Sequence, residues 1–289
     1  MSNRITAARD ILRYLLSHPV AGRQPVRSVG RVILWQLRSR LARKPINHRW
    51  IGDTRLVMTR GMPGASGNIY LGLHEFSDMA FTVHFLRPDD RFCDIGANVG
   101  TYTVLAAALC GARCDTFEPD ADTLDKLSAN IVANRIGALV DIHPLVLSGE
   151  NRKVAFTVGL DTINRVTDAG PGSRTVDARK LDDVLMTMPS LIKIDVEGHE
   201  DAVFSGAQKV MSAPQLLAII VETVGEVALE TFRTHGFVER YYDPYRRRIS
   251  LERNPWLDNN RLFIRESALA EVERRVETAP KLDIFGIAV

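Results

Sequence analysis

The segment DIGANVG (94–100) constrains the fold of this chain more than any other feature. It stands between an apolar run, 91–95, and an alanine-rich stretch, 102–109. Glycines at a turn from a strand into a helix permit positive φ angles and let the backbone approach a ligand, and the amino end of the helix attracts an anionic group. We therefore expect a strand, a tight turn and a helix here, with a nucleotide-type ligand at the turn.

Short apolar runs and helix-like stretches alternate after residue 91, as they do when helices cover both faces of a parallel sheet. The predicted strands are 91–95, 113–117, 140–147, 191–196 and 216–222, and the predicted helices are 102–109, 121–134 and 199–210. Two later segments, 237–242 and 261–264, are expected to close the sheet as an antiparallel pair. Residues 62–67 are expected to form a loop, and 151–179 an excursion without an assigned element.

Charge is distributed unevenly along the chain. Residues 1–44 carry ten Arg or Lys and one Asp, whereas the remainder has more acidic than basic residues. Apolar residues at helical spacing predict two helices in this basic arm, 4–17 and 29–43, the second with a stripe of Val29, Ile33, Leu37 and Leu41. Two interpretations of the arm stay open: its helices pack on the core or form a homodimer contact, or the arm rests on an anionic membrane surface or a membrane-bound partner.

The expected compartment is the cytoplasm. No stretch approaches the roughly 20 apolar residues that span a bilayer, and charged residues interrupt the only candidate signal peptide. The three cysteines are too few for a disulfide framework or a zinc cluster and are expected to be small buried side chains in a reducing environment. Peripheral contact with the inner membrane face through residues 1–44 would be consistent with this placement.

Two cofactors compete for the glycine turn. Dinucleotide folds use three glycines so that the backbone reaches a pyrophosphate, but the middle position here is Asn98. S-adenosylmethionine has no pyrophosphate, and its ammonium group favours an acid at the strand end, which Asp94 supplies. A second acid, Glu118, ends the next strand, where a carboxylate accepts hydrogen bonds from both ribose hydroxyls. The residues therefore favour S-adenosylmethionine over NAD.

At this point the sequence resembles the FkbM family of methyltransferases. The resemblance rests on DIGANVGTYT (94–103), FEP (117–119), the helix with Asn130 and Asn134, LDDVL (181–185), IKIDVEGHE (192–200) and IIVET (219–223). It covers about residues 70–265 and includes Glu75 ahead of the glycine loop. Its motifs assign cofactor binding to Asp94, Gly96, Asn98, Gly100, Thr101, Glu118 and Pro119.

The resemblance implies an α/β fold of the Rossmann-like class I methyltransferase type: a seven-stranded mixed sheet with helices on both faces. S-adenosyl-L-methionine is the implied donor, and oxygen is the usual acceptor atom, on sugars of a glycan or glycolipid or on a secondary metabolite. We expect an N-terminal basic helical arm and cap in 1–85, the catalytic domain in 86–266, and a C-terminal helix and tail in 267–289.

The acceptor site is expected at DVEGHE (195–200). Ligands of open α/β sheets lie beyond the carboxyl ends of the strands. Three carboxylates and a histidine directly follow a buried strand here, and such polar side chains rarely serve as core residues. An alcohol needs a base to remove its proton, and Asp195 or His199 is the candidate. Residues expected to contact or support the acceptor are Glu75, Glu197, Glu200 and Glu222. These carboxylates suit a divalent metal, but no metal is predicted.

Two other functions share some of these features. An NAD-dependent oxidoreductase has the same strand, glycine turn and ribose-binding acid, but Asn98 argues against it. A nucleic-acid methyltransferase is supported only by the basic arm, since the rest of the chain is acidic; no nucleic-acid partner is therefore expected.

Overall fold

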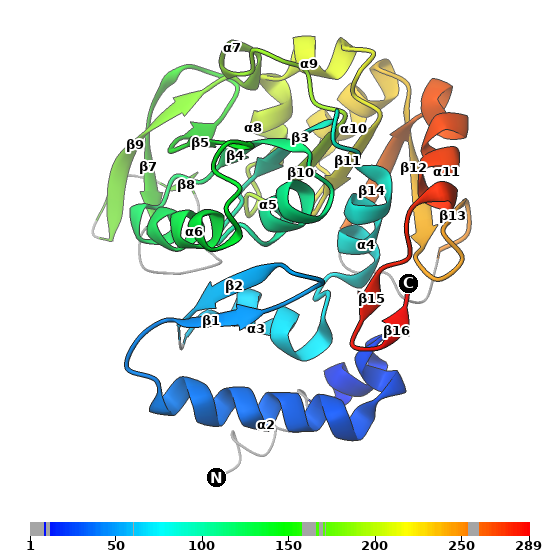
Figure 1. Cartoon of the computed structure of the whole chain (residues 1–289). Coiled ribbons are helices and arrows are strands. Elements are labelled where there is room, and N and C mark those ends of the chain that lie inside the picture. Colours follow the sequence, from blue (N-terminus) through cyan, green and yellow to red (C-terminus); the bar gives the residue numbers. More distant parts are fainter. Residues whose placement is uncertain are drawn as a thin grey trace.

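A mixed β-sheet lies at the centre of the fold (Figure 1). In the part of the chain that the computed structural model describes, residues 9, 12–59, 61–157, 166–167, 170, 172–253 and 260–289, the sheet has eight strands in the order β13-β12-β14-β11-β10-β3-β4-β5. They are β3 (Arg91–Ile95), β4 (Arg113–Phe117), β5 (Val140–His143), β10 (Leu191–Ile194), β11 (Ala218–Val221), β12 (Phe237–Asp243), β13 (Arg248–Ser250) and β14 (Arg261–Arg265).

The strands from β5 to β11 run parallel, and β14 lies antiparallel between β11 and β12. The α/β class and the antiparallel closing pair are therefore confirmed. The predicted count of seven strands is one too low, because the chain turns back after β12 and adds β13 at the edge.

Helices cover both faces of this sheet. The helices are α4 (Phe76–Phe85), α5 (Thr101–Val104), the π-helical turn η2 (Leu105–Leu109), α6 (Ala121–Asn134), α7 (Leu181–Val184), α8 (Glu200–Ser205), α9 (Gln208–Ser212), α10 (Glu226–Thr234), the short 3-10 turn η4 (Glu266–Ala268) and α11 (Leu269–Thr278). Alternate strand residues point to opposite faces. Phe92 packs with α4, α5, α6 and α11, whereas its neighbour Cys93 packs with α7, α8, α9 and α10.

The three cysteines are free. Cys93 and Cys114 are buried as expected, whereas Cys110 is only partly buried.

The predicted helix 199–210 is divided in two at Gly206. A Cβ at this glycine would lie 2.2 Å from the backbone oxygen of Ser148, so the chain passes too close for a side chain and α8 ends there. By contrast, α6 keeps the predicted bounds. Asp120 caps its amino end by accepting from the backbone of Thr123 at 3.0 Å, and Arg135 ends it in the left-handed conformation.

The excursion after β5 forms a sheet of its own. Its described strands are β6 (Val146–Leu147), β7 (Arg152–Thr157), β8 (Val166–Thr167) and β9 (Ser173–Arg179), in the order β6-β9-β7-β8. The prediction of one strand over 140–147 is wrong, because the chain leaves the main sheet after His143 and pairs with β9 instead. A small apolar core that includes Val154 and Phe156 stabilises this sheet.

The amino-terminal part lies below the main sheet in Figure 1 and contains η1 (Ala21–Arg23), α2 (Pro25–Leu41), β1 (Ile46–Arg49), β2 (Arg55–Met58) and α3 (Pro63–Leu71). The predicted loop at 62–67 is wrong, since Pro63 begins a helix there. The predicted helix 4–17 falls partly outside the described residues, of which 12–17 are helical. Trp35 of α2 belongs to the same core as α4 and the main sheet. The short hairpin of β15 (Asp283–Ile284) and β16 (Ile287–Ala288) packs beside this part.

Two asparagines of α6 hold the free edge of β2. Asn134 accepts from the Arg55 backbone N–H and donates to its carbonyl, each at 2.8 Å. Asn130, fully buried, accepts from the Val57 N–H at 2.6 Å and donates to the Val99 carbonyl in the glycine loop at 2.8 Å. These side chains therefore tie the amino-terminal part to the loop that follows β3.

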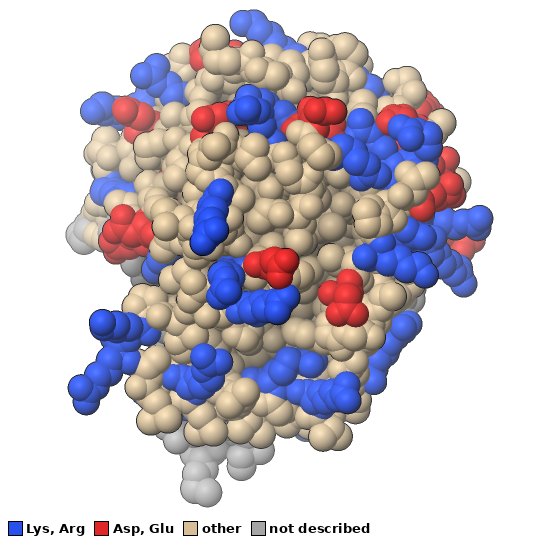
Figure 2. Space-filling view, in the orientation of Figure 1, with Lys and Arg blue, Asp and Glu red and all other residues tan. Residues whose placement is uncertain are grey.

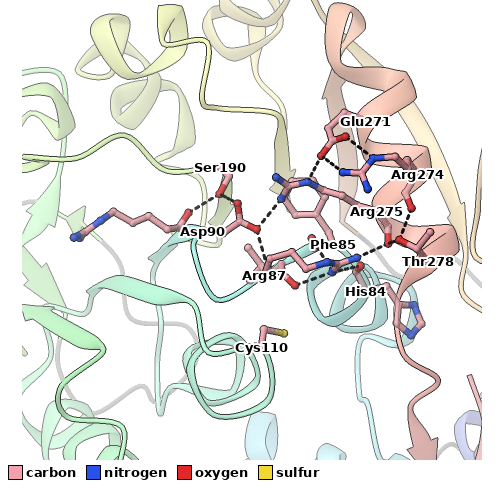
Figure 3. Close-up of polar contacts among 12 residues, drawn as sticks. His84, Phe85, Arg87, Asp90, Cys110, Ser190, Glu271, Arg274, Arg275 and Thr278 are labelled. Atoms are coloured by element: carbon pink, nitrogen blue, oxygen red, sulfur yellow. Dashed lines mark hydrogen bonds and ion pairs between the residues drawn. The ribbon is translucent and has the colours of Figure 1, made fainter.

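An ionic network joins α11 to the amino end of the main sheet (Figure 3). Asp90 accepts from Arg275 and from the Arg87 backbone, both at 2.7 Å, and from Ser190 at 2.9 Å. The Arg87 guanidinium donates to three carbonyls at the end of α4 and to the Arg275 carbonyl. This end of the sheet is therefore held together by structural contacts.

Among the described helices, none is long and apolar enough to cross a membrane.

Candidate active site

A cavity of about 400 Å³ opens at the carboxyl ends of β3, β4, β10 and β11. Part of α3 and the small sheet form its other walls, through Asn68 and Phe156. Most residues predicted for the site line this one cavity: Glu75, Asp94, Gly96, Asn98, Thr101, Glu118, Pro119, Asp195, Glu197, His199 and Glu222. Gly100 and Glu200 do not line it. The structure therefore brings the glycine turn and the DVEGHE segment to the same space.

The two glycines of the turn are needed for close packing. Gly96 has φ +75°, and a Cβ there would lie 1.8 Å from the backbone oxygen of Asp195. Its N–H donates to the Phe117 carbonyl at 3.0 Å, which joins the turn to the end of β4. Gly100 has φ +81° at the start of α5, and a Cβ would lie 2.3 Å from Leu127. Gly100 thus lets the turn pack against Leu127 of α6, at a position that does not line the cavity.

Asn98 occupies the position at which dinucleotide-binding proteins have their middle glycine. Its φ is +52°, a left-handed conformation that Asn tolerates better than most residues. The side-chain oxygen accepts from the Val99 N–H at 2.7 Å, and the backbone N–H donates to Glu118 at 3.0 Å. The asparagine therefore stabilises the turn by itself and leaves its side chain at the cavity wall.

Glu118 is buried at the end of β4. One carboxylate oxygen accepts from the Asn98 N–H and the other from the Asp120 N–H, at 3.0 and 2.8 Å. Burial raises the pKa of Glu118 to about 7, and the two backbone donors oppose that rise. Each carboxylate oxygen has a second lone pair. Glu118 can thus accept two further hydrogen bonds from a diol in the cavity.

Asp94 is 1% exposed and has one oxygen without a partner. Its Oδ2 accepts from the Thr103 hydroxyl at 2.6 Å, whereas Oδ1 has no hydrogen-bond partner among the described residues. Burial raises its pKa to about 6, and the nearby Lys193 charge opposes that rise. An unsatisfied buried carboxylate oxygen is costly, so a donor from a ligand would stabilise it.

Lys193 is the main residue that the sequence analysis missed. It lies inside the apolar run LIKI, is 3% exposed, and its ammonium group is 2.6 Å from Oδ2 of Asp195. Burial lowers the pKa of Lys193, but the charges of Asp195, Glu75 and Asp94 together outweigh burial and raise it above its usual value. A single lysine within a strand that is otherwise apolar was the available signal, since a buried lysine requires acidic partners.

Asp195, Glu197 and Glu222 form an acidic cluster beside this lysine. Oxygens of the three carboxyls lie within 4.8 Å of one another. Burial would raise the pKa of Asp195, but the charge and hydrogen bond of Lys193 lower it below the usual range. Burial and the Asp195 charge raise the pKa of Glu222 to about 7, and the two carboxyls share a hydrogen bond. Lys193 thus places one positive charge next to the cluster, in contact with Asp195.

His199 precedes α8 and faces the cavity from the loop after β10. Burial lowers its pKa, and the positive charge of Arg152 lowers it further. Its Nε2 is buried and has no hydrogen-bond partner within the described part of the chain. The lowered pKa keeps the imidazole in its neutral form near pH 7. Glu200, in contrast, is turned away from the cavity and accepts from the Gly198 N–H at 3.3 Å.

Glu75 also lines the cavity, and its charge acts on Lys193. It accepts from the Tyr102 hydroxyl at 2.6 Å and from the Asn260 amide at 3.2 Å. The same amide donates to Asp78 at 3.0 Å, and burial, together with the charge of Glu75, raises the pKa of Asp78 to about 7. Tyr102 and Asn260 were not predicted, because their contacts join segments distant in the sequence. These hydrogen bonds fix the Glu75 carboxylate in the cavity wall.

Comparison with known proteins gives one curated relative and several solved structures of limited similarity. A hexuronic acid methyltransferase of Haloferax volcanii is 26% identical over 140 residues, which are 45% of this chain and 55% of that protein. The alignment thus spans about half the length of that relative. A crystal structure of an FkbM methyltransferase from Methylobacillus flagellatus matches with a TM-score of 0.43 and 16% identity, covering 83% of this chain and 60% of that one. An O-methyltransferase from Bacillus cereus matches with a TM-score of 0.36 and 14% identity, covering 64% and 77%.

The family comparison is more extensive. Residues 94–247 match the methyltransferase FkbM domain, which is more than half of the chain. The match begins at Asp94 and includes Glu118, Asp195, His199 and Glu222, all of which line the cavity. The recognition made from the sequence motifs is therefore confirmed, and the chain belongs to the FkbM methyltransferase family.

Proposed function

We propose that this methyltransferase transfers the methyl group of S-adenosylmethionine to a hydroxyl oxygen of a carbohydrate-containing acceptor. The observation that carries the proposal is one cavity whose walls include the glycine turn, Glu118, the acidic cluster and His199. Its volume of about 400 Å³ falls within the range of small-molecule sites.

The chain's residues fit the cofactor. Glu118 offers two oxygens to the ribose hydroxyls, and the unpartnered Oδ1 of Asp94 offers an acceptor to the ammonium group of the methionine part. A Cβ at Gly96 would lie 1.8 Å from the backbone oxygen of Asp195, so the glycine lets the cofactor turn pack directly against the segment that carries Asp195. When bound, the sulfonium supplies an activated methyl group to an aligned nucleophile.

We assign removal of the proton from the acceptor hydroxyl to His199. We assign the positioning of that hydroxyl to Asp195. A lowered pKa makes the Asp195 carboxylate a weak base, and Lys193 already occupies one of its oxygens. His199 is neutral near pH 7 and lines the cavity, as a general base requires. Of the two candidates named from the sequence, the structure thus favours His199 for this step.

The acidic cluster suits an acceptor with several hydroxyl groups, because Asp195, Glu197 and Glu222 can accept hydrogen bonds from a polyol. The similarity to a hexuronic acid methyltransferase supports a sugar as the acceptor class. We place the hydroxyl that receives the methyl group next to this cluster.

Two measurements test the proposal. Calorimetric titration is expected to show that S-adenosylhomocysteine binds the wild-type protein and that NAD does not. Methyl transfer from labelled S-adenosylmethionine to a panel of glycans and nucleotide sugars is then compared for wild type, Asp195→Asn and His199→Gln. We expect His199→Gln to lose about 10²–10⁴ in kcat, as for loss of a general base. Binding of NAD alone would refute the cofactor assignment, and near-normal turnover of His199→Gln would remove that residue from the base role.

A further inference from the structure

Helix α2 presents an apolar stripe to solvent. Its members and their exposed fractions are Val26 (84%), Ile33 (54%), Leu34 (58%), Leu37 (53%) and Leu41 (80%). With about 100° between successive residues, these five side chains fall within an arc of roughly 100° on the helix surface. A stripe of this width on a helix of a globular protein normally faces the core. Here it faces outward.

The opposite face of α2 is firmly attached to the protein. Trp35 is buried in the main core, and Ser28 is buried and donates to the Ala21 carbonyl at 2.9 Å. Arg31 and Gln36 donate to the backbone and hydroxyl oxygens of Tyr70 in α3, both at 3.2 Å. The outward direction of the stripe is therefore fixed by contacts on the inner face. Val29, which the sequence analysis included in the stripe, packs inward instead.

Positive charge flanks the apolar stripe. Exposed Arg40 lies on one side of it, and exposed Arg27 and Arg38 lie on the other. The sequence has no Asp or Glu between residues 12 and 52. Figure 2 shows Lys and Arg side chains over the lower edge of the molecule, where α2 lies, with no acidic side chain between them. The surface of α2 thus combines apolar side chains with one sign of charge.

We propose that this surface of α2 docks on an anionic lipid membrane. The apolar stripe would enter the interfacial region, and the flanking arginines would contact anionic headgroups. A second copy of the chain is a poorer occupant, because two such surfaces face to face would bring like charges together. Charge complementarity therefore selects an anionic lipid surface rather than a dimer.

Membrane docking would also orient the cavity. Helix α3 contacts α2 through Tyr70 and lines the cavity with Ala65 and Asn68. The helix that would dock therefore contacts a helix that lines the cavity. This arrangement suits an acceptor carried at the membrane, but the docking itself does not depend on the methyl-transfer proposal.

Vesicle flotation of the full-length protein tests the inference. We expect binding to vesicles of phosphatidylcholine with phosphatidylglycerol, none to phosphatidylcholine alone, and weaker binding when salt rises from roughly 0.01 M to about 1 M. Ile33→Ser with Leu37→Ser is expected to reduce the partition coefficient more than about tenfold. Replacing Arg27, Arg38 and Arg40 by Gln is expected to reduce it more strongly, at roughly fivefold per charge.

Matched controls change exposed apolar and arginine residues elsewhere on the surface. Val132 (75% exposed) and Met186 (94%) are replaced by Ser, and Arg233 and Arg246, with side chains 68% and 81% exposed, by Gln. These controls are expected to float as wild type does, and thermal unfolding checks that all variants are folded. If wild type ignores anionic vesicles at low salt, or if the α2 variants float unchanged, the proposal is wrong. A dimer in light scattering that Ile33→Ser with Leu37→Ser dissociates, without flotation of wild type, would assign the surface to a second copy instead.

Discussion

Replacing Lys193 by Met should destabilise the protein in a way that depends on pH. The substitution keeps most of the apolar stem and removes the positive charge that lies 2.6 Å from Asp195. In the wild-type protein the side chain of Lys193 is 4% exposed and that of Asp195 is 32% exposed. The variant therefore leaves a carboxylate in partly buried surroundings without its partner, and with Glu75 and Asp94 nearby.

The magnitude follows from the geometry. Two unit charges 2.6 Å apart attract by about 6 kcal/mol at an effective dielectric constant of about 20. Much of this attraction is offset by the cost of removing the ammonium group from water. Breaking a buried pair by removing one partner typically costs about 3–5 kcal/mol. Because about a third of the Asp195 side chain contacts solvent, we expect a smaller loss, about 2–4 kcal/mol near neutral pH.

The loss should diminish at low pH. In wild type, Lys193 holds the pKa of Asp195 below its usual value, so the pair stabilises the fold above the unfolded pKa of the carboxyl and the stabilisation is lost as pH falls through the folded pKa. In the variant, burial without the lysine raises the pKa of Asp195 in the folded state. The contribution of this carboxyl to stability is then greatest at low pH and is lost as pH rises. The deficit of the variant should therefore be largest near about pH 8 and smallest near about pH 4–5.

Denaturant unfolding across this pH range measures the effect. Lys209→Met is the control, since Lys209 is exposed and should change little at any pH. Adding Asp195→Asn to Lys193→Met should recover part of the lost stability, because it removes the uncompensated charge. An equal deficit at low and high pH, or no recovery in the double variant, would contradict the electrostatic explanation and indicate that Lys193 acts through packing alone.

Three further predictions concern the turn, the ribose site and the network of α11. Gly96→Ala would place a Cβ 1.8 Å from the Asp195 carbonyl at a positive φ, so thermal unfolding should show a loss of about 2–4 kcal/mol, and calorimetry should show no S-adenosylhomocysteine binding. Because burial raises the pKa of Glu118 to about 7, wild-type affinity for that ligand should fall as pH drops from about 8 to 6; Glu118→Gln should bind about tenfold or more weakly at pH 8 with little pH dependence. Arg275→Met removes the contact of 2.7 Å with Asp90 and should lower the melting temperature by roughly 4–12 °C, corresponding to about 2–4 kcal/mol; no shift would mean that the pair is energetically neutral.

Local signals predicted the sheet and the cofactor side of the site well. The strands β3 and β4 and the helix α6 have the predicted bounds, because each is a periodic run ending at Gly, Asp or Pro signals. The adjacent carboxyl ends of parallel strands then brought Asp94, Glu118 and Asp195 together, as the strand order requires.

Contacts between distant segments set what the sequence could not predict. Residues 63–71 begin with Pro and contain two glycines, a composition that indicates a loop, yet they form α3 because Ile69 and Leu71 are buried by the surrounding structure. The strand after β5 leaves the main sheet because β9 offers a partner at residues 178–179. Of the acidic partners of Lys193, Asp195 lies two residues away, but Glu75 and Asp94 come from other elements, so the local sequence did not show how a buried lysine is compensated.

The contact between α6 and β2 has a consequence for how the family can diversify. Asn130 and Asn134 form hydrogen bonds with main-chain atoms of Arg55 and Val57. These hydrogen bonds therefore do not depend on the side chains of the strand. Any extended segment that offers the same row of N–H and C=O groups would meet these two amides equally well. The exposed side chain of Arg55 is thus free to change while the attachment persists, whereas Leu56 and Met58 are fully buried in the main core and must remain apolar. Grafting a different amino-terminal cap onto this catalytic core should therefore require a strand edge in register and apolar side chains at these two positions, but no other matching sequence in the strand.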